Sequence, residues 1–352
     1  MTHPSPYLSV VMPVHNAQTV LPDTLGALGR SDFDRGSWEL VVVDDASTDD
    51  SAAVAAPHAD RVVRLADRPR GPAFARNRGA EACRGEVLVF VDSDVRIAPD
   101  ALGRLARHFQ EDPELGAAFG SYDDQPPAPG VVSQYRNLLH HYHHHRGAGD
   151  AETFWAGLGA VRTGVFRQLD GFDQRRYTRP QIEDIELGRR IRRAGYRIVL
   201  DPAVGGAHLK RWTLGQIFRT DLLHRGIPWM KLLLAEGGAS QVLNVKPMEK
   251  LCVALVGLSL ATLAVAAFVG SPVLALVGIA SVAVAVALNL PLYRYMSRGR
   301  GVGFALAVIP LHLGYYVTSG LSFIAGHVAH RIAPTSLDAE DDPTAAVAMG
   351  SE

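Results

Sequence analysis

The chain has 352 residues, enough for one substantial domain and a further region. Its formal net charge is −1, but residues 334–352 carry five acids and no base, which leaves +4 for the rest. That excess is too small for a nucleic-acid-binding protein, which needs a concentrated basic face. Cys83 and Cys252 fit neither a disulfide framework nor a metal site, which suits a reducing compartment. The N-terminal residues have no signal-peptide pattern, so we expect no cleaved signal.

Three apolar runs near the N-terminus are each followed by polar residues. The runs are residues 8–12, 40–43 and 87–91. Near-continuous β-branched runs separated by helix-length segments indicate a parallel sheet covered by helices on both faces. Ligands of such sheets bind beyond the carboxyl ends of the strands. We therefore expect Asp45, Asp92 and Asp94 to lie at a ligand site.

Asp92 and Asp94 stand one residue apart in the segment VFVDSD. Two carboxylates held this close repel each other, and burial makes their charged forms costlier. A hard divalent cation such as Mg²⁺ would relieve both effects, because it prefers carboxylate and phosphate oxygens. The alternative is that one of the two acids only caps the next helix or turn.

The segment RPRGPAFARNRGAEACRG, residues 68–85, contains several bases at the predicted start of a helix. Gly71 and Pro72 suit a turn with proline at the first helical position. Arg70, Arg76 and Arg78 gather near that start, where a helix N-terminus favours anions. A solvated basic face is the alternative, but together with the carboxylates the segment predicts a diphosphate site bridged by a metal ion.

Four segments in this order, SVVMPVHN, VVVDDASTD, GPAFARNRG and VFVDSD, resemble the nucleotide-sugar half of family 2 glycosyltransferases. The resemblance implies the GT-A fold, an α/β domain with a Rossmann-like mixed sheet that binds nucleotide-diphospho-sugars. It implies that Pro13 lies beside the base of the donor, that Asp45 contacts the base and that Arg76 helps to hold the nucleotide. It also implies that Asp92 lies near the ribose and the metal, and that Asp94 is a ligand of Mg²⁺ or Mn²⁺.

The segment FWAGLGAVRTGVFRQLDGFD begins at Phe154 and combines small residues with a short predicted helix. Gly157 and Gly159 permit close approach of the backbone to a ligand, and Thr163 could cap the helix. The segment resembles the acceptor side of the same family, which places Trp155 and Gly157 in the acceptor region. A tight strand-to-helix turn would explain the glycines equally well.

Glu183 and Asp184 open a predicted helix whose far end carries four arginines. The helix dipole favours this arrangement without any function. In the family that the sequence resembles, an ED pair here supplies the catalytic base, which is matched by Asp184, and Glu183 lies in the acceptor region. The implied reaction is a single inverting displacement, in which the base removes a proton from the acceptor hydroxyl.

The segment HLKRWT follows the last predicted strand of the domain. By resemblance, His208 completes the metal shell with Asp94 and Asp92; a surface histidine is the alternative. Trp212 is assigned to the acceptor region. The segment is similar to the QxxRW motif of processive members, but the glutamine is missing, so no polymerase is inferred.

Five histidines lie between Arg136 and Gly147. The pairs His140–His144 and His141–His145 have the i, i+4 spacing of helical zinc ligands. However, no cysteine or acid nearby completes a zinc set. We expect instead a helix beside the acceptor cleft, with imidazoles that could respond to pH.

Residues 213–234 read as an amphipathic helix in which Trp229 and Lys231 follow Pro228. Such a helix fits the headgroup layer of a membrane. The alternative is an ordinary surface helix of the domain.

Three uncharged stretches follow, each close to the ~20 residues that an α-helix needs to cross a bilayer. They are residues 251–269, 272–293 and 302–325. A large soluble helical core is the alternative, although soluble helices usually keep a polar face. Arg294, Arg298 and Arg300 lie in the predicted loop between the last two stretches. Because basic short loops stay in the cytoplasm, we expect a cytoplasmic catalytic domain and a C-terminal tail outside the cell membrane.

The sequence therefore predicts four regions, a GT-A catalytic domain, an amphipathic juxtamembrane segment, three transmembrane helices and an acidic disordered tail. They cover residues 1–212, 213–248, 249–329 and 330–352. The predicted function is transfer of a sugar from a nucleotide-diphosphate donor to a hydroxyl of a membrane-associated, lipid-linked or glycolipid acceptor. Two alternatives remain: an enzyme that loads sugar onto polyprenyl phosphate, and a non-catalytic nucleotide-sugar-binding membrane protein.

Overall fold

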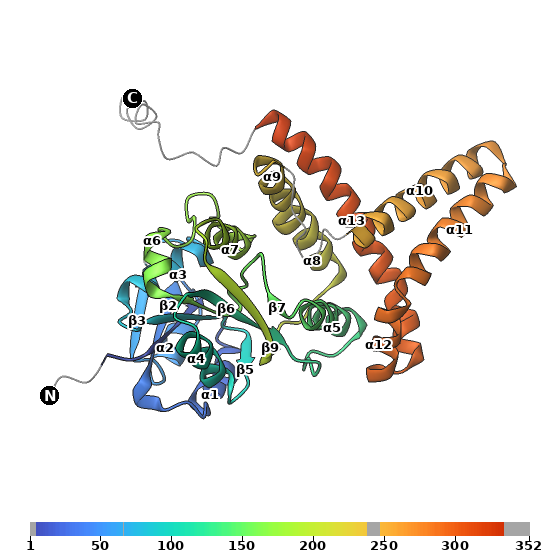
Figure 1. Ribbon diagram of the computed structural model, residues 1–352. Coiled ribbons are helices and arrows are strands. Elements are labelled where there is room, and N and C mark those ends of the chain that lie inside the picture. Colours follow the sequence, from blue (N-terminus) through green and yellow to red (C-terminus); the bar gives the residue numbers. More distant parts are fainter. Residues whose placement is uncertain (1–4, 66, 238–246, 334–352) are drawn as a thin grey trace. The chain divides into compact units, whose positions relative to one another are not determined.

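The computed structural model describes residues 5–65, 67–237 and 247–333 (Figure 1). Its chain divides into two compact units. The first comprises the described part of residues 1–217 together with Val286–His312, and the second comprises Phe218–Ala285 and the described residues from Leu313 onward. Most of the predicted acidic tail lies outside the described residues.

A nine-stranded mixed sheet forms the centre of the first unit. The strands are β1 Leu8–Val14, β2 Trp38–Asp45, β3 Arg61–Leu65, β4 Val87–Val91, β5 Val95–Ile97, β6 Leu115–Tyr122, β7 Gly149–Asp150, β8 Leu158–Arg162 and β9 Arg197–His208. Their order is β3-β2-β1-β4-β8-β6-β9-β5, with β7 beside β9. β1, β2, β3 and β4 run parallel, whereas β8 is antiparallel to β4 and β6. The predicted parallel strands and the mixed sheet are thus confirmed.

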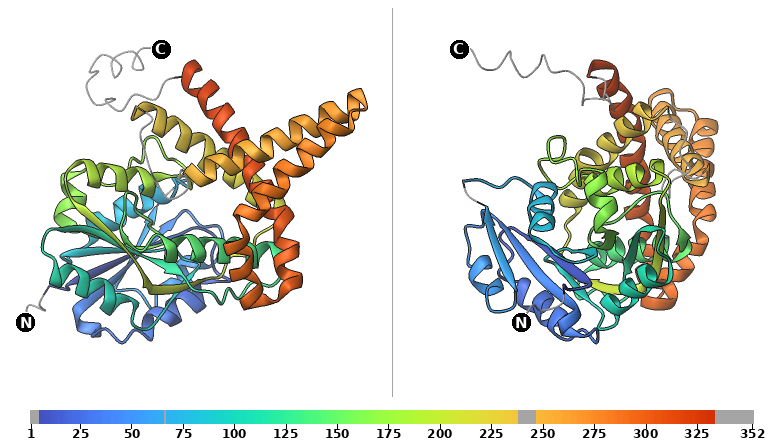
Figure 2. Two further views of the ribbon diagram at one scale, coloured as in Figure 1. Left: turned by 45° about the vertical axis from the view of Figure 1, so that its right-hand side comes forward. Right: turned by 60° about the vertical axis from the view of Figure 1, so that its left-hand side comes forward.

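Helices cover both faces of this sheet (Figure 2). They are α1 Leu21–Gly29, α2 Ser51–Ala55, α3 Pro72–Ala82, α4 Ala101–Glu111, α5 Val131–Arg146, α6 Thr163–Gln168 and α7 Glu183–Arg193. Side chains alternate between the faces of a strand, so Val10 joins the core that contains α1 and α4, whereas Val11 faces α3. Gly79 of α3 is needed for this packing, because a Cβ there would lie 2.4 Å from a methyl of Val11.

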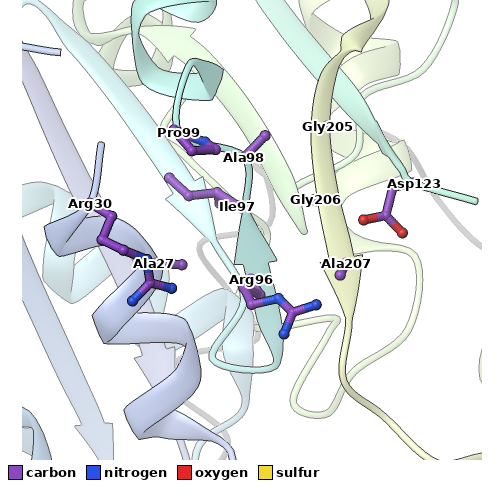
Figure 3. Close-up of a pocket in the computed structure, with 10 residues that line it drawn as sticks. All are labelled: Ala27, Arg30, Arg96, Ile97, Ala98, Pro99, Asp123, Gly205, Gly206 and Ala207. Atoms are coloured by element: carbon purple, nitrogen blue, oxygen red, sulfur yellow. The ribbon is translucent and has the colours of Figure 1, made fainter. Parts of the chain in front are cut away.

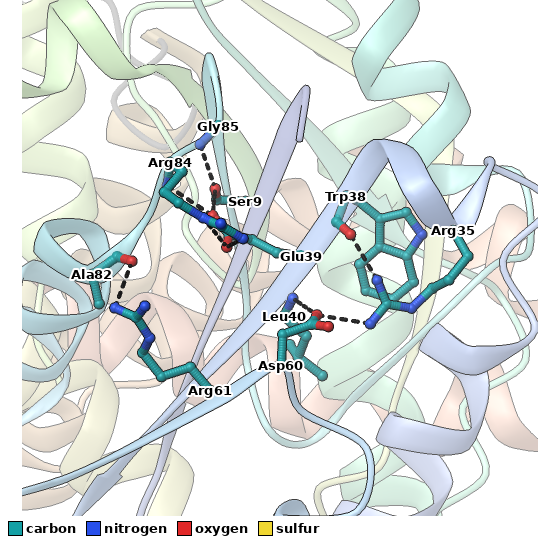
Figure 4. A network of polar contacts seen from close by, with 10 residues as sticks. All are labelled: Ser9, Arg35, Trp38, Glu39, Leu40, Asp60, Arg61, Ala82, Arg84 and Gly85. Atoms are coloured by element: carbon teal, nitrogen blue, oxygen red, sulfur yellow. Dashed lines mark hydrogen bonds and ion pairs between the residues drawn. The ribbon is translucent and has the colours of Figure 1, made fainter. Parts of the chain in front are cut away.

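A buried polar network fixes the amino ends of β1, β2 and β4, opposite the edge where a ligand is expected (Figure 4). The Ser9 hydroxyl donates to Glu39 Oε1 at 2.7 Å and accepts the backbone N–H of Gly85 at 2.8 Å. The backbone N–H of Arg84 donates to the same Glu39 oxygen at 2.7 Å, and its guanidinium binds the other oxygen. A buried carboxylate with every oxygen paired is tolerated, and this one holds the strands in register.

The first unit also contains α12 (Leu290–Arg300) and the first turns of α13 (Val302–Ile332). A cluster of buried side chains joins them to α5. It consists of Tyr135, Leu138, Leu139, Leu292, Tyr293, Met296, Ala305 and Val308. The Arg300 guanidinium extends this contact by donating to Gln134 Oε1 at 3.0 Å and to the Asp124 carbonyl. These parts of the C-terminal region therefore belong to the same compact unit as the sheet.

The second unit is helical. It contains a π-helical segment at Thr220–Gly226, α9 Ile227–Ala235, α10 Pro247–Val269, most of α11 Pro272–Leu288 and the later turns of α13. α10 and α11 form an antiparallel hairpin (Figures 1 and 2). Among the described helices, two are long and apolar enough to cross a membrane, α10 and α13. The bent pair of α11 and α12 would make a third span if it counts as one.

Three local predictions differ from the structure; two were wrong, and one predicted helix is divided into successive segments. The predicted loop at residues 294–301 is mostly α12, which bends by 61° from α11 at Asn289, where Pro291 in the first turn of α12 lacks an N–H. The predicted amphipathic helix is α8 (Leu214–Arg219), the π-helical segment and α9 in succession. Thr163 does not cap α6; its hydroxyl donates to the Gly85 carbonyl at 2.7 Å instead.

Candidate active site

The predicted site residues gather at the carboxyl ends of β1, β2 and β4. Pro13 is half-buried and pairs with Val43 there, and Asp45 ends β2. Asp92 and Asp94 follow β4, as the topology rule for such sheets requires. The helices α3 and α7 bring Arg76 and Asp184 to the same edge, because Arg76 binds both Asp92 and Glu183, the neighbour of Asp184.

Asp45 anchors the turn that leads into α3. Its two carboxylate oxygens accept the backbone N–H groups of Arg70 and Gly71, at 2.8 and 2.7 Å. Gly71 has a φ of +90°, a conformation that side chains with a Cβ disfavour, and a Cβ there would also collide with Thr178. Pro72 begins α3, as predicted. Asp45 thus sets the position of the turn whose bases were expected to meet the donor.

Arg76 is the centre of a buried ion-pair network. Its guanidinium donates to Asp92 Oδ1 at 2.7 Å and to Glu183 Oε1 at 2.9 Å, and its side chain is only 5% exposed. Burial alone would lower the pKa of Arg76, but the carboxylates of Asp92, Glu183 and Asp184 raise it above its usual value. The guanidinium is therefore a fixed cation that joins the acids after β4 to the start of α7.

Asp184 lies beside this network, in the first turn of α7. One of its oxygens accepts the backbone N–H of Ala156 at 3.1 Å, and the other accepts that of Ile185 at 2.8 Å. Burial, with the neighbouring charge of Glu183, raises the pKa of Asp184 to about 6, although Arg76 opposes the shift. A carboxylate with a pKa near 6 is ionised at neutral pH and is a stronger base than an ordinary aspartate.

Asp94 faces His208 from the opposite strand. The distance from Asp94 Oδ2 to His208 Nε2 is 3.4 Å. His208 Nδ1–H donates to Asn137 Oδ1 at 2.8 Å, so Nε2 is the ring nitrogen that faces the carboxylate. Although burial opposes it, contact with His208 and the charge of Lys210 keep the pKa of Asp94 below its usual value.

This pair has the chemistry of a divalent-cation site. A carboxylate oxygen and an imidazole nitrogen converge, and the second ring nitrogen is fixed by an outer partner, as in most histidine metal ligands. Within the described ranges no group of three or more His, Cys, Asp and Glu side chains is arranged to hold a metal. One oxygen of Asp92, the third predicted ligand, is occupied by Arg76. The chain therefore offers two ligands, and Mg²⁺ sites often draw the others from substrate phosphates and water.

The four residues assigned to the acceptor region have different surroundings. Trp155 packs edge-on against Tyr122, with ring centroids 4.8 Å apart, and a Cβ at Gly157 would strike the Trp155 indole at 2.4 Å. Gly157 is therefore required by packing within the chain. Glu183 is buried and paired with Arg76, so it is a positioning residue. Trp212 is also buried, and its backbone N–H donates to Ser133 Oγ at 2.8 Å.

Two histidines of α5 bond to backbone carbonyls of β6. His144 Nδ1–H donates to the Gly120 carbonyl, and His141 Nδ1–H donates to that of Tyr122. Burial lowers the pKa of His144 to about 3, so this ring is neutral. The prediction of a helix is confirmed. These contacts attach α5 to β6, and the described residues give no support for a zinc site.

A separate cavity of about 280 Å³ lies between the end of α1 and the β5–β9 pair (Figure 3). Its lining contains none of the predicted site residues; it is made by Ala27, Arg30, Arg96, Ile97, Ala98, Pro99, Asp123, Gly205, Gly206 and Ala207. Arg96 pairs with Ala207, and the next pair along the ribbon is Val95 with His208. Because side chains alternate between faces, Arg96 projects from the opposite face of the ribbon to His208.

Sequence reasoning missed two residues of the site. Asn137 orients His208, and Tyr122 stacks on the His208 ring with centroids 4.4 Å apart and planes within 5°. Tyr122 could have been found as the last residue of a strand that ends at the ligand edge. Asn137 shares a helical face with His140 and His144 at i+3 and i+7 spacing, but nothing in the sequence tells which residue it contacts.

The mixed sheet and the acids at its carboxyl edge define a GT-A nucleotide-diphospho-sugar transferase fold. Residues 9–169, a little under half of the chain, match the model of the family "Glycosyl transferase family 2". The predicted fold class is thereby confirmed, and the match supports the predicted family over these residues.

Curated relatives match over part of the chain. A validoxylamine A glucosyltransferase of Streptomyces hygroscopicus subsp. limoneus is 36% identical over 136 residues, which is 36% of this chain and 30% of that enzyme. The poly(ribitol-phosphate) β-N-acetylglucosaminyltransferase TarS of Staphylococcus aureus is 32% identical over 107 residues, 29% of this chain and 19% of TarS. The match therefore spans less than a third of each of these relatives.

Solved structures share the fold at low identity. Mannosyltransferase PcManGT from Pyrobaculum calidifontis, in complex with GDP-Man and Mn²⁺, aligns with a TM-score of 0.57 and 20% identity over 93% of this chain and 88% of its own. GalNAc-T7 with UDP, GalNAc and Mn²⁺ aligns with a TM-score of 0.50 and 17% identity over 66% of this chain and 48% of its own.

Proposed function

We propose that the chain is a metal-dependent inverting glycosyltransferase that moves a sugar from a nucleotide-diphosphate donor to a hydroxyl of a membrane-associated acceptor. The observation that carries this proposal is the network in which Arg76 binds both Asp92 and Glu183 beside Asp184. It unites the acids after β4, where a donor would bind, with the helix that carries the candidate base. The names of the curated relatives, all sugar transferases where a reaction is given, support the same reaction class.

Asp184 is the candidate general base. Its pKa of about 6 leaves it ionised at neutral pH, ready to accept the proton of an acceptor hydroxyl. The N–H groups of Ala156 and Ile185 hold one oxygen each and fix the orientation of the carboxylate. Direct attack of the hydroxyl on the anomeric carbon inverts the configuration there, so no second carboxylate is needed for a covalent sugar intermediate.

Asp94 and His208 would hold a Mg²⁺ or Mn²⁺ ion together with the donor diphosphate. Such an ion, when bound, neutralises charge that develops on the departing nucleoside diphosphate. Asn137 keeps His208 Nε2 directed at Asp94, and Arg76 keeps Asp92 in place. The Mn²⁺ in both structures that share the fold supports this assignment.

A membrane-associated acceptor is supported by α10 and α13, which are long and apolar enough to cross a bilayer. Confining enzyme and acceptor to one surface favours a lipid-linked or glycolipid acceptor. The basic residues Arg294 and Arg298 are exposed on α12, which supports a cytoplasmic catalytic domain at the cell membrane.

The test uses the purified full chain in detergent with Mn²⁺, a panel of nucleotide-diphospho-sugars and a membrane lipid extract. We expect release of nucleoside diphosphate and labelled sugar in the lipid fraction with inverted anomeric configuration. Retention of configuration would contradict the mechanism. If donor binds but no extract supports turnover, the non-catalytic alternative replaces the proposal.

The polyprenyl-phosphate alternative differs in its need for a base. A phosphate acceptor is already anionic, so Asp184→Asn should then keep substantial turnover, whereas transfer to a hydroxyl should nearly cease. Measuring this variant with polyprenyl phosphate and with the extract separates the two reactions.

A further inference from the structure

The first turns of α13 are fixed to the catalytic unit. Ala305 and Val308 pack in one buried cluster with Leu138 and Leu139 of α5. On its other side α5 is bound to the sheet, because Asn137 and His144 bond to β9 and β6. The first turns of α13 therefore lie on the membrane face at which the catalytic unit lies.

The later turns of α13 contact the π-helical segment and α9. A Cβ at Gly226 would lie 2.0 Å from Ser322 Oγ, and a Cβ at Gly326 would lie 2.4 Å from the Cβ of Met230. These backbones approach so closely that only glycine fits at both crossings. Ser322 and Gly326 of α13 are thus packed against the π-helical segment and α9.

These two contacts are incompatible with an upright span. Ser322 lies 20 residues beyond Val302, or about 30 Å along a helix, which is the thickness of the hydrocarbon core. Gly226 would then have to lie at the far surface of the membrane. Yet Gly226 is only 14 residues beyond Trp212, and the backbone N–H of Trp212 is bonded to Ser133 of α5. Because these residues are mostly helical, they span about 21 Å.

The composition of the segment from Trp212 to the end of α9 gives a second reason. It carries Arg219, Asp221, Arg225 and Lys231, and ionised side chains are costly inside a bilayer. Arg219 and Arg225 are exposed in the structure. The segment, and with it the part of α13 that it contacts, belongs at the membrane surface.

The side chains of α13 are arranged as expected for a helix at that surface. Its buried residues include the polar His312, Thr318 and Ser322. Its exposed residues include large apolar side chains at i, i+3 and i+7, namely Leu321, Ile324 and Val328, which are 43%, 62% and 51% exposed. A helix with its polar side against protein and its apolar side outward suits the boundary between headgroups and acyl chains.

We propose that only the α10–α11 hairpin crosses the bilayer, and that α13 lies along the same membrane face as the catalytic domain, with its apolar side in the lipid. The C-terminus then returns to the catalytic side. This differs from the expectation of three spans with an outside tail, which rested on length, composition and loop charge. The inference depends on the contacts of α13, on the short chain distance from Trp212 to Gly226 and on the charges of that segment, and it does not rest on the proposed reaction.

The test is cysteine labelling of the full chain in membranes with a membrane-impermeant maleimide. Ser351→Cys reports the tail, and Ser271→Cys reports the turn of the hairpin. Glu111→Cys, at an exposed position of α4, is the catalytic-side reference. The native Cys83 and Cys252 are buried, so the unsubstituted chain gives the background.

In intact cells we expect labelling of Ser271→Cys at least tenfold above that of Ser351→Cys and Glu111→Cys. In inverted membrane vesicles the order should reverse. If Ser351→Cys reacts from the side opposite to Glu111→Cys, α13 crosses the bilayer and the proposal is overturned. If Ser271→Cys reacts from the same side as Glu111→Cys, the hairpin does not cross, and the proposal also fails.

Discussion

Two parts of the site contain the same kind of side chain in opposite electrostatic situations. Asp92, one residue before Ser93, is paired with the buried guanidinium of Arg76, which Glu183 holds from the other side. Asp94, one residue after Ser93, faces Nε2 of His208. The first carboxylate therefore has a permanent cation as its partner, whereas the partner of the second is an imidazole, which can also coordinate a metal ion.

This difference indicates a division of labour. A carboxylate neutralised by a buried arginine is a structural support, because removing either partner leaves an uncompensated buried charge. A carboxylate beside an imidazole nitrogen can bind a metal ion from outside the chain. Under the proposed mechanism, the Arg76 network therefore supports the side of the site that carries the candidate base, and the Asp94–His208 pair lies on the side of the leaving group.

The largest effect is expected at the base. Asp184→Asn should lower kcat by about 10²–10⁴-fold, because general-base catalysis contributes that much. Donor affinity should stay within about threefold, since the variant keeps Asp94, His208 and the Arg76 network. Steady-state kinetics and a donor-binding titration check both expectations.

The same variant should have nearly the same stability. Burial raises the pKa of Asp184 to about 6, so keeping it ionised at pH 8 costs the fold about 1–3 kcal/mol. The neutral amide avoids that cost but can accept only one of the N–H groups of Ala156 and Ile185, so the two effects oppose each other and the temperature of thermal unfolding at pH 8 should change little. A clear drop in unfolding temperature would mean that the loss of activity reflects damage to the fold.

Breaking the Arg76 network should produce the largest loss of stability. Arg76→Gln leaves the buried Glu183 and the half-buried Asp92 without their cation, which should cost about 3–5 kcal/mol. Arg84→Gln is the matched control: its side chain is 62% exposed, and Glu39 keeps the Ser9 hydroxyl and a backbone N–H (Figure 4). That control should cost about 1 kcal/mol or less. Equal shifts of the unfolding temperature in both variants would contradict a special role for Arg76.

The proposed metal site at Asp94 and His208 can be tested by replacing Asn137, which bonds to His208. Asn137→Ala removes the acceptor that fixes the His208 ring, and loss of such an outer partner typically weakens metal binding by about 10–100-fold. We expect the Mn²⁺ concentration for half-maximal activity to rise by that factor. A variant that was only partly folded would have a lower maximal rate but an unchanged Mn²⁺ concentration for half-maximal activity. That result would contradict the role of Asn137 in orienting His208 for metal binding.

The smallest effect is the response to pH. Because the pKa of Asp184 is raised to about 6, the base is ionised above this pH and becomes protonated as the pH falls through it. The value of kcat/KM should therefore be level near pH 7 and fall about tenfold for each unit well below pH 6. A pH profile with saturating Mn²⁺ tests this, and an acid limb near pH 4 would indicate an unperturbed carboxylate.

Much of this site follows from sequence because it depends on local patterns. Apolar runs that end in acids place Asp45, Asp92 and Asp94 at one edge of a parallel sheet. Pro72 marks the start of α3 because its missing N–H costs nothing there. Glu183 and Asp184 likewise mark the N-terminus of α7, because the helix dipole favours acids there whether or not they take part in catalysis.

The remainder depends on contacts between residues far apart in the chain. Arg76 and Glu183 are separated by 107 positions, and Asn137 and His208 by 71, so no spacing rule relates them. Similarly, hydropathy alone describes α13 as a span, whereas the close approach of Gly226 to Ser322 is visible only in three dimensions.

The most direct test of the account is Mn²⁺ binding measured by electron paramagnetic resonance on the full chain with nucleoside diphosphate. The account predicts one bound Mn²⁺ in the unsubstituted chain and in Asp184→Asn, and a loss of binding of at least tenfold in Asp94→Asn. Unchanged Mn²⁺ affinity in Asp94→Asn would contradict it.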